Sequence, residues 1–316
     1  MCKRIVALVM MILGLLAWGC ESPEDEGIEG TQVSTPNIKE EPYYFSFTTG
    51  TSVSEIHDIT LKQESMSYIV TLNAAANISA VVKATGDFDT TAYSFADTAQ
   101  FDGAEYVIGD KWMDESTYNP TDHSISNNGT FYFVRAAGYQ IVKFMVVSAS
   151  PSVYNIKYAV SVDVGTTFPT ATEQGVSYSV ESPVDFSFSQ GAGITPAEWH
   201  IGLITSPVAG APFPMQNVII NYENNTKVAI ISDQAFADLE SVPTDMSWLT
   251  ASSQNRPLAY GGEHEVLTYN PVNHTVSIVN PDLVYVVNTP DGNYYKLRLV
   301  NYEQSAGIIE FEYAAL

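Results

Sequence analysis

The sequence has few cysteines and few basic residues. Its only cysteines are Cys2 and Cys20, near the start of the chain, so the chain beyond Cys20 can form no internal disulfide. Lys and Arg number 13 against 36 Asp and Glu, which gives a formal net charge of −23. Nucleic acid and anionic lipid headgroups bind basic surfaces, so this charge argues against both as partners.

Catalytic motifs are also missing. We find no nucleophile elbow, no phosphate-binding glycine loop and no Cys–His pair. The five histidines, at positions 57, 123, 200, 264 and 274, do not stand at metal-ligand spacing. We therefore predict no catalytic residues, no metal site and no enzyme activity. Glycoside hydrolysis stays formally open, because the sequence does not give the separation of carboxylate pairs.

The longest apolar run lies at the N-terminus. Lys3 and Arg4 precede about a dozen apolar residues, and Gly19-Cys20 closes the segment. A bilayer-spanning helix needs roughly 20 apolar residues, so residues 1–19 are predicted to be a signal peptide. Their end resembles the lipobox of bacterial lipoproteins, which predicts a lipidated Cys20. The alternative is an ordinary secretory leader followed by an incidental cysteine.

Residues 20–41 are predicted to be an acidic, flexible tether, because Glu, Gly, Pro, Ser and Thr dominate and no apolar pattern is present. Acids directly behind the cysteine resemble an export signal to the outer leaflet in one group of Gram-negative anaerobes. They predict an outer-membrane lipoprotein that faces the cell exterior. The alternative is that they only solvate the tether.

Beyond residue 41 the chain has the composition of β-strands. Short segments rich in Val, Ile, Tyr, Phe and Thr alternate with Gly, Asn, Asp and Pro turns. Only residues 233–239 look helical. The predicted class is all-β, with antiparallel sheets and little helix.

Two segments of the chain resemble each other. A Thr-Tyr-Asn-Pro motif followed by histidine occurs at 117–123 and again at 268–274, and Phe-Ser-Phe occurs at 45–47 and 186–188. Such self-similarity indicates tandem domains. We predict one β domain at 42–161, a linker at 162–181 and a second β domain at 182–316. Coincidence among common strand residues is the alternative.

The C-terminal segment predicts an antiparallel meander with a tight turn at Asp291-Gly292. Lys296 and Arg298 alternate with Leu297 and Leu299. This alternation predicts one solvated face and one buried face.

The run from Val284 to Leu297, closed by residues 309–313, resembles the C-terminal signature of the HmuY family. Asp185 to Phe188 and Trp199-His200-Ile201-Gly202 resemble the family's beginning, and a fainter copy covers 42–161. The family comprises haem-binding surface lipoproteins of Gram-negative anaerobes. The resemblance implies an all-β fold and a haem held between two side-chain ligands, usually His and in some members Met.

The family's ligands do not carry over directly. One of the two positions holds Pro271, and the other falls near Leu239. Other soft ligands are therefore our haem-ligand candidates: Met246, Met215 and His264, with Trp248 as a porphyrin-stacking residue. Core packing is the alternative for the methionines and simple solvation for His264. His123 and His274 recur in both copies and are predicted to be turn or packing elements.

The predicted function is capture and uptake of haem or a related ligand, with haem-carrying proteins as further partners. The alternatives are a structural or adhesive subunit and a glycan-binding module, and the sequence gives no indication of the oligomeric state. A glycan-binding module would be favoured if aromatic side chains such as Trp112 and Trp248 lined one flat surface.

The lipid anchor is directly testable. Cys20→Ala should leave an unprocessed or soluble protein, because the thiol that carries the diacylglyceryl group is gone. Labelling with radioactive palmitate measures this, with unsubstituted protein as the control. Palmitate on the Cys20→Ala protein would show that the anchor lies elsewhere.

Overall fold

The computed structural model describes residues 30–316 except 85, 164, 166 and 208–212. The signal peptide, Cys20 and most of the tether therefore lie outside the described residues. Nearly all regular structure in the described part is antiparallel β, as predicted. The helical elements are short: α1 (Phe95–Thr98), η1 (Glu115–Thr117), η2 (Ala137–Tyr139) and η3 (Tyr222–Asn224). Residues 233–239, predicted to be helical, form bends and turns instead. Within the described residues, no helix is long and apolar enough to cross a membrane.

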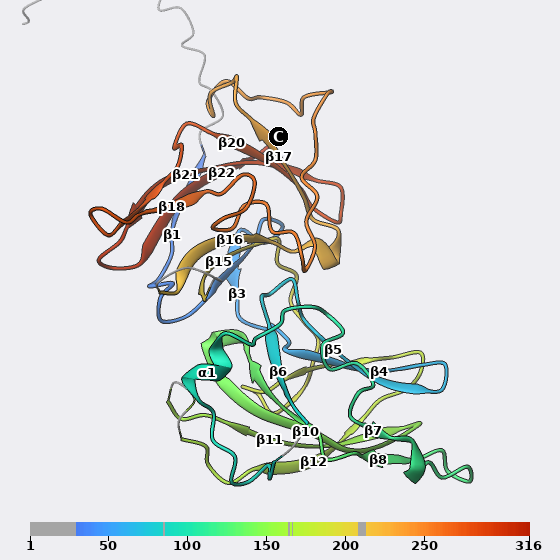
Figure 1. Ribbon diagram of the computed structural model, residues 1–316. Helices are drawn as coiled ribbons and strands as arrows, with labels where there is room; N and C mark the ends of the chain where they lie inside the picture. The colour runs from blue at the N-terminus through green and yellow to red at the C-terminus, as the bar shows by residue number, and fades with distance from the viewer. Residues whose placement is uncertain (1–29, 85, 164, 166, 208–212) are drawn as a thin grey trace, which may run out of the picture.

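The strands form two lobes (Figure 1). The lower lobe, residues 59–194, contains a seven-stranded sheet and a four-stranded sheet with the order β14-β13-β4-β5. Its strands are β4 (Ile59–Glu64), β5 (Ser67–Leu72), β6 (Ser79–Lys83), β7 (Met113–Asp114), β8 (Ile125–Asn127), β9 (Phe131–Arg135), β10 (Ile141–Ser150), β11 (Val153–Val160), β12 (Thr172–Ser177), β13 (Val184–Ser187) and β14 (Ala192–Ile194).

The upper lobe contains both residues 30–53 and residues 201–316. Its main sheets have the orders β1-β22-β21-β20-β17 and β16-β15-β2-β3, beside the hairpin β18-β19. Its strands are β1 (Thr31–Ser34), β2 (Tyr43–Ser46), β3 (Thr51–Val53), β15 (Ile201–Ser206), β16 (Met215–Ile220), β17 (Lys227–Ile231), β18 (Leu267–Asn270), β19 (Thr275–Ile278), β20 (Val284–Asn288), β21 (Tyr294–Glu303) and β22 (Ile308–Ala315).

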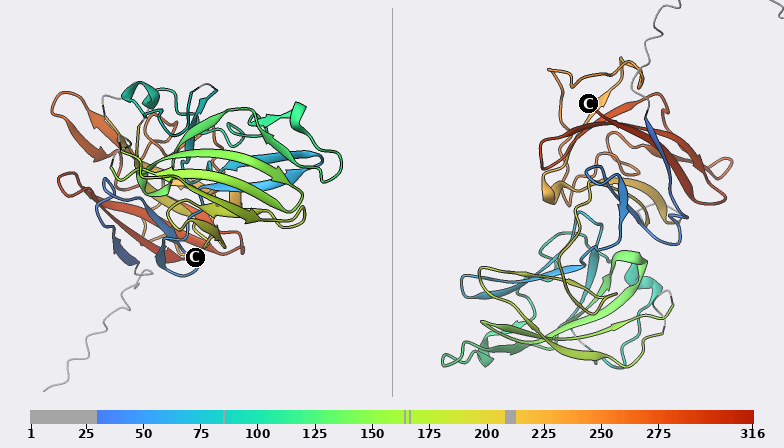
Figure 2. Two further views of the ribbon diagram at one scale, coloured as in Figure 1. Left: turned by 90° about the horizontal axis from the view of Figure 1, so that it is seen from below. Right: turned by 180° about the vertical axis from the view of Figure 1, so that it is seen from behind.

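The two halves of the sequence exchange a hairpin. The hairpin β2-β3 leaves the first half and pairs through β2 with β15 of the upper lobe. The hairpin β13-β14 leaves the second half and pairs through β13 with β4 of the lower lobe. The chain crosses between the lobes at residues 54–58 and 195–200, and the lower lobe is thus one continuous insertion into the upper lobe (Figure 2). This pairing differs from the predicted division, in which 42–161 and 182–316 each form a unit.

The exchanged hairpins make matching contacts. The turn glycines Gly50 and Gly191 both have positive φ, at 67° and 62°. A Cβ atom on Gly50 would lie 2.7 Å from the Tyr313 hydroxyl, and one on Gly191 would lie 2.7 Å from the Tyr158 hydroxyl. Glycine is therefore required at both turns for its backbone and for its missing side chain. In each lobe, the turn glycine comes from the hairpin of one half of the sequence and the tyrosine comes from the other half.

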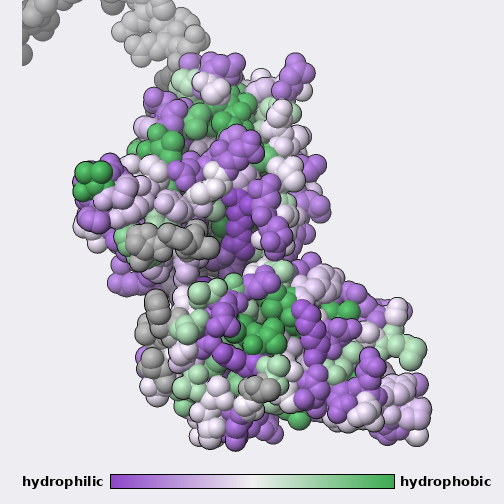
Figure 3. Space-filling model, viewed as in Figure 1, coloured by the Kyte–Doolittle hydropathy of each residue, from purple (hydrophilic) through white to green (hydrophobic). Residues whose placement is uncertain are grey.

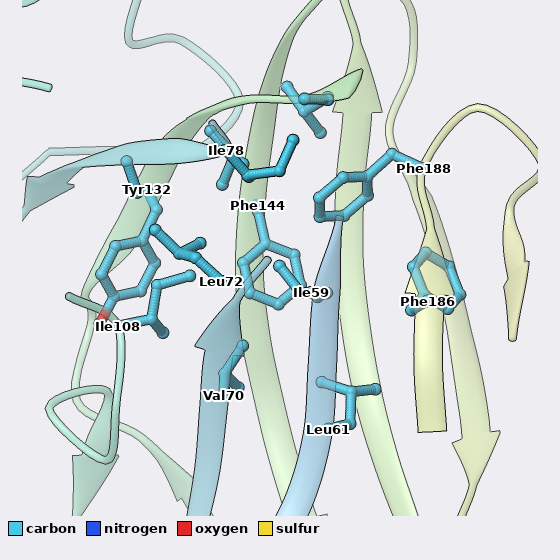
Figure 4. Close-up of a cluster of buried hydrophobic side chains, with 14 of the residues drawn as sticks. Ile59, Leu61, Val70, Leu72, Ile78, Ile108, Tyr132, Phe144, Phe186 and Phe188 are labelled. Carbon is cyan, nitrogen blue, oxygen red and sulfur yellow. The ribbon is translucent and has the colours of Figure 1, made fainter. Parts of the chain in front are cut away.

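Aromatic residues of the exchanged hairpins fill both cores. Phe186 and Phe188 are 0% and 2% exposed in the lower lobe, and Phe188 lies 5.4 Å from Phe144 between ring centroids (Figure 4). In the upper lobe, Phe45 packs 5.2 Å from Phe311. A buried Phe contributes about 3–5 kcal/mol relative to Ala. Each lobe therefore depends on a hairpin that the other half supplies.

The sheet formed by β16, β15, β2 and β3 joins the two cores. One face of this sheet carries Phe45 and Leu203 into the upper core. The other face carries Tyr44 and Ile204 into the cluster that fills the lower lobe. Apolar packing is therefore continuous across the junction between the lobes.

Two segments predicted to be unstructured contain strands. β1 lies inside the predicted tether and pairs with β22, and Ile38 is fully buried. β12 lies inside the predicted linker and pairs with β11 over six residues. Both are edge strands with polar, mostly exposed side chains. Their sequences therefore lack the apolar pattern from which a strand is predicted.

The prediction of a solvated face on β21 is wrong for Lys296. Lys296 is 0% exposed, because the loop after β17 covers this face with Phe236 and Leu239. Its Nζ donates a hydrogen bond to the Phe236 carbonyl at 2.7 Å. The sheet β1-β22-β21-β20-β17 is thus packed on both faces around Lys296.

Hairpin exchange predicts which fragments fold. A fragment of residues 56–197 should unfold cooperatively, because it contains β13 and β14. A fragment of residues 42–161 should not unfold cooperatively, because it lacks Phe186, Phe188 and the strand pairing of their hairpin. These losses together exceed the free energy of unfolding of a typical domain, about 5–15 kcal/mol. Urea denaturation followed by circular dichroism measures both. Cooperative unfolding of 42–161 alone would contradict the exchange.

Candidate functional site

Two buried acceptors hold the exchanged hairpins. Asp58 ends one connection between the lobes, and its Oδ2 accepts a hydrogen bond from the Phe188 N–H at 2.7 Å. His200 ends the other connection, and its Nδ1 accepts from the Phe47 N–H at 3.0 Å. The two side chains are 1% and 0% exposed. Asp58 and His200 therefore each accept the hydrogen bond that holds an exchanged hairpin, Asp58 through a carboxyl oxygen and His200 through an imidazole nitrogen.

A proline explains why the two acceptors differ. Asp58 has a second donor, the Ala137 N–H, at 2.7 Å from its Oδ1. The residue 153 positions later in the upper lobe is Pro290, which has no N–H. A carboxylate at position 200 would lack that second donor, whereas a neutral imidazole needs only one. The His200 Nε2 faces the Glu198 carboxylate at 3.4 Å.

Burial shifts the pKa of both acceptors toward their neutral forms. Desolvation lowers the pKa of His200, against the attraction of Glu198. Desolvation raises the pKa of Asp58 to about 7, although its two backbone N–H donors favour the charged form. A neutral imidazole is the form that can accept from Phe47, so the low pKa preserves this hydrogen bond.

His123 and His274 lie in turns, where the sequence predicted structural roles. Both have φ of 56°. The Nδ1 atoms of His123 and His274 lie 2.5 Å from the hydroxyls of Tyr118 and Tyr269, respectively. Each Tyr belongs to the Thr-Tyr-Asn-Pro motif that precedes the histidine, so the motif closes its own turn.

The predicted haem ligands lie in separate places. Met215 is 0% exposed in β16, within the core of the upper lobe. Met246 and Trp248 are half-buried and lie together in the cluster on the outer face of β20, near Phe236. The Trp248 ring is 6.4 Å from Tyr294. The structure therefore brings Met246 and Trp248 together but leaves Met215 apart.

His264 lies at the surface beside the junction of the lobes. Its side chain is 39% exposed, and its Nε2 is 3.9 Å from the Glu263 carboxylate. Glu263 lines a cleft of about 390 Å³ between the lobes, together with Tyr260, Asn77 and Arg256. Hydrophilic residues gather on the upper lobe just above this junction (Figure 3).

Arg256 connects the lobes at that cleft. Its guanidinium donates hydrogen bonds to the Asn77 side chain and, at 3.1 Å, to the Ala74 carbonyl. Nearby, Glu223 of the upper lobe accepts from the Ala75 N–H at 3.1 Å. These contacts join the two lobes beside the cleft.

The HmuY family model, described as HmuY protein, matches residues 39–313. The match spans both lobes and includes both exchanged hairpins. The chain belongs to the HmuY family. A comparison with curated proteins found no match. HmuY is a haem-binding family.

Three clefts of the described residues lack paired His or Met ligands for haem. Haem iron is held by His, Met, Cys or Tyr side chains. The clefts of about 390, 370 and 360 Å³ have no His, Met or Cys among their lining residues, whereas Tyr260 lines the first and Tyr43 and Tyr44 line the third. The described residues also contain no group of three or more His, Cys, Asp or Glu placed to hold a metal ion. Axial ligation by two His or Met side chains, the pair that the family resemblance implies, does not fit these three clefts.

The two acceptors predict opposite pH dependences of stability. The pKa of His200 is lowered on folding, so its contribution is present above about pH 6.5 and is lost as the pH falls further. The pKa of Asp58 is raised to about 7, so its contribution is present below about pH 4 and is lost as the pH rises toward 7.

Each variant should remove one of these dependences. As the pH falls from 7 to 5, wild type should lose stability relative to His200→Gln and gain stability relative to Asp58→Asn. The measurement is the free energy of unfolding in urea at several pH values. Parallel pH profiles for all three proteins would show that neither group titrates as described.

Proposed function

We propose that this protein is a lipid-anchored, non-enzymatic protein of the outer membrane that faces the exterior and captures haem or a related ligand. Membership of the HmuY family carries the proposal, because members are haem-binding surface lipoproteins. The leader, Cys20 and the acids that follow it support the location. Haem-carrying proteins are the corresponding source of ligand.

Met246 and His264 are the proposed ligands that haem can reach. Met246 is half-buried beside Trp248, the proposed porphyrin-stacking residue. His264 is exposed next to the cleft between the lobes. Met215 has no exposed surface, so ligation through its sulfur requires β16 to separate from the core. The two accessible residues are therefore proposed as separate attachment points.

We further propose that the two lobes descend from a duplicated unit. Equivalent glycine–tyrosine contacts, histidine turns and buried lysines recur in both halves, and their sequence separation rises along the chain from 141 residues for Gly50 and Gly191 to 155 for Tyr158 and Tyr313. A glycan-binding role has less support, because Trp112 is 0% exposed and so cannot form one flat exposed surface with the half-buried Trp248.

Titration with haemin tests haem capture. The chain after Cys20 should shift the Soret band, and reduction with dithionite should tighten binding if Met246 ligates, because Met favours reduced iron. Met246→Leu or His264→Gln should then change the spectrum. Met215→Leu is the matched control and should not, since this sulfur is buried.

A spectrum of free haemin under both redox conditions would overturn the haem assignment. The family membership would stand, and the captured ligand would be another molecule. An unchanged Soret shift in the Met246→Leu, His264→Gln double variant would instead show that other residues hold the iron.

A further inference from the structure

Each lobe buries a lysine at the same place. Lys143 on β10 and Lys296 on β21 are 153 residues apart and are 4% and 0% exposed. The Lys143 Nζ donates to the Phe88 carbonyl at 3.0 Å, as Lys296 does to Phe236 at 2.7 Å. An ammonium has three donors. Among the described residues, neither lysine forms an ion pair within 4.0 Å.

The surroundings of the two lysines differ. In the upper lobe, the space above Lys296 is filled by Phe236 and Leu239, with Met246 and Trp248 packed against them. In the lower lobe, Lys143 lines a cleft of about 370 Å³. The other lining residues are Phe88, Asp89, Ala159, Phe168, Pro169, Thr170 and Ala171. The lower lobe is therefore open where the upper lobe is filled.

Aromatic rings form two walls of this cleft. The Lys143 Nζ lies 4.8 Å from the centroid of Phe168 and 5.9 Å from that of Phe88. Asp89 is the acidic residue of the lining, and its carboxylate is bound by Lys157 at 2.9 Å. The Lys157 Nζ also lies 4.9 Å from the Phe88 centroid. The cleft thus combines apolar ring surfaces with an ammonium that lacks a counter-ion.

The charge on Lys143 is poorly compensated. Burial lowers the pKa of Lys143, while Asp89 and Asp87 act only at a distance to raise it. A buried cation with unused donors is stabilised by an anion that enters its site. Because the net charge of −23 repels anions in general, an anion that also buries apolar surface against Phe88 and Phe168 fits this site better than a small inorganic anion.

We propose that this cleft binds a small aromatic carboxylate. The ring packs against Phe88 and Phe168 at the mouth of the cleft, and the carboxylate accepts hydrogen bonds from the Lys143 ammonium. This site lies in the lower lobe, goes beyond the proposed function and does not depend on haem capture.

Isothermal titration of the chain after Cys20 with 1-naphthoate tests the site. 1-Naphthalenemethanol, which has the same rings without the charge, should bind at least tenfold more weakly. Lys143→Met keeps the length of the side chain and removes the donors, so it should weaken 1-naphthoate binding by roughly ten- to a hundredfold, as expected for a charge-assisted hydrogen bond. Lys296→Met is the matched control and should leave the affinity unchanged.

A second variant keeps the test valid if Lys143→Met unfolds. Thr170 is exposed at the rim of the cleft, so Thr170→Trp should fold, as thermal melting will show, and should block binding by filling the space. No binding of 1-naphthoate at millimolar concentration would overturn the proposal. Equal binding of the neutral analogue, or an affinity that Thr170→Trp leaves unchanged, would do the same.

Discussion

The structure depends on an exchange of hairpins, in which each half of the sequence gives one hairpin to the lobe formed mainly by the other half. Neither lobe has a complete sheet without β2-β3 or β13-β14, and neither core is filled without the phenylalanines on those hairpins. Asp58 and His200 fix the exchange with one buried hydrogen bond each. Because both acceptors stand where the chain crosses between the lobes, the connections and the cores are held by the same residues. The lower lobe is therefore complete only with a hairpin from the second half of the sequence, and the upper lobe only with a hairpin from the first half.

Much of the β architecture could be predicted from the sequence, but the partners of the hairpins could not. The Phe-Ser-Phe motifs at 45–47 and 186–188 are identical, so either hairpin fits either lobe by composition alone. Two features favour the exchanged arrangement over one in which each hairpin stays with its own half. They are the short connections between the lobes and the buried acceptor, Asp58 or His200, at the end of each connection. The edge strands β1 and β12 escaped prediction for a simpler reason, since their side chains are polar and exposed.

Among the candidate site residues, too, neighbours in sequence could be placed together, whereas contacts between distant segments could not be predicted. Met246 and Trp248 are two residues apart and indeed lie together, whereas Met215 belongs to a strand whose six residues are all buried. The sequence did not predict the burial of Lys296 and Lys143, because a lysine that alternates with leucine or phenylalanine predicts a solvated face. Their burial results from loops that cover the outer faces of the sheets, and loops carry no periodic pattern. The repeated offset of 153 residues is the signal that links the two lysines.

The path of the chain sets the order of the lobes relative to a membrane. The upper lobe contains both the first described strand and the last, and β1 begins at Thr31. With lipid on Cys20, the intervening tether of about ten residues reaches at most roughly 36 Å. Under the proposed anchoring, the upper lobe is kept close to the bilayer and the inserted lower lobe stands farther out. If the protein faces the exterior as proposed, a molecule that diffuses toward the cell meets the cleft above Lys143 before it reaches the surfaces around Met246.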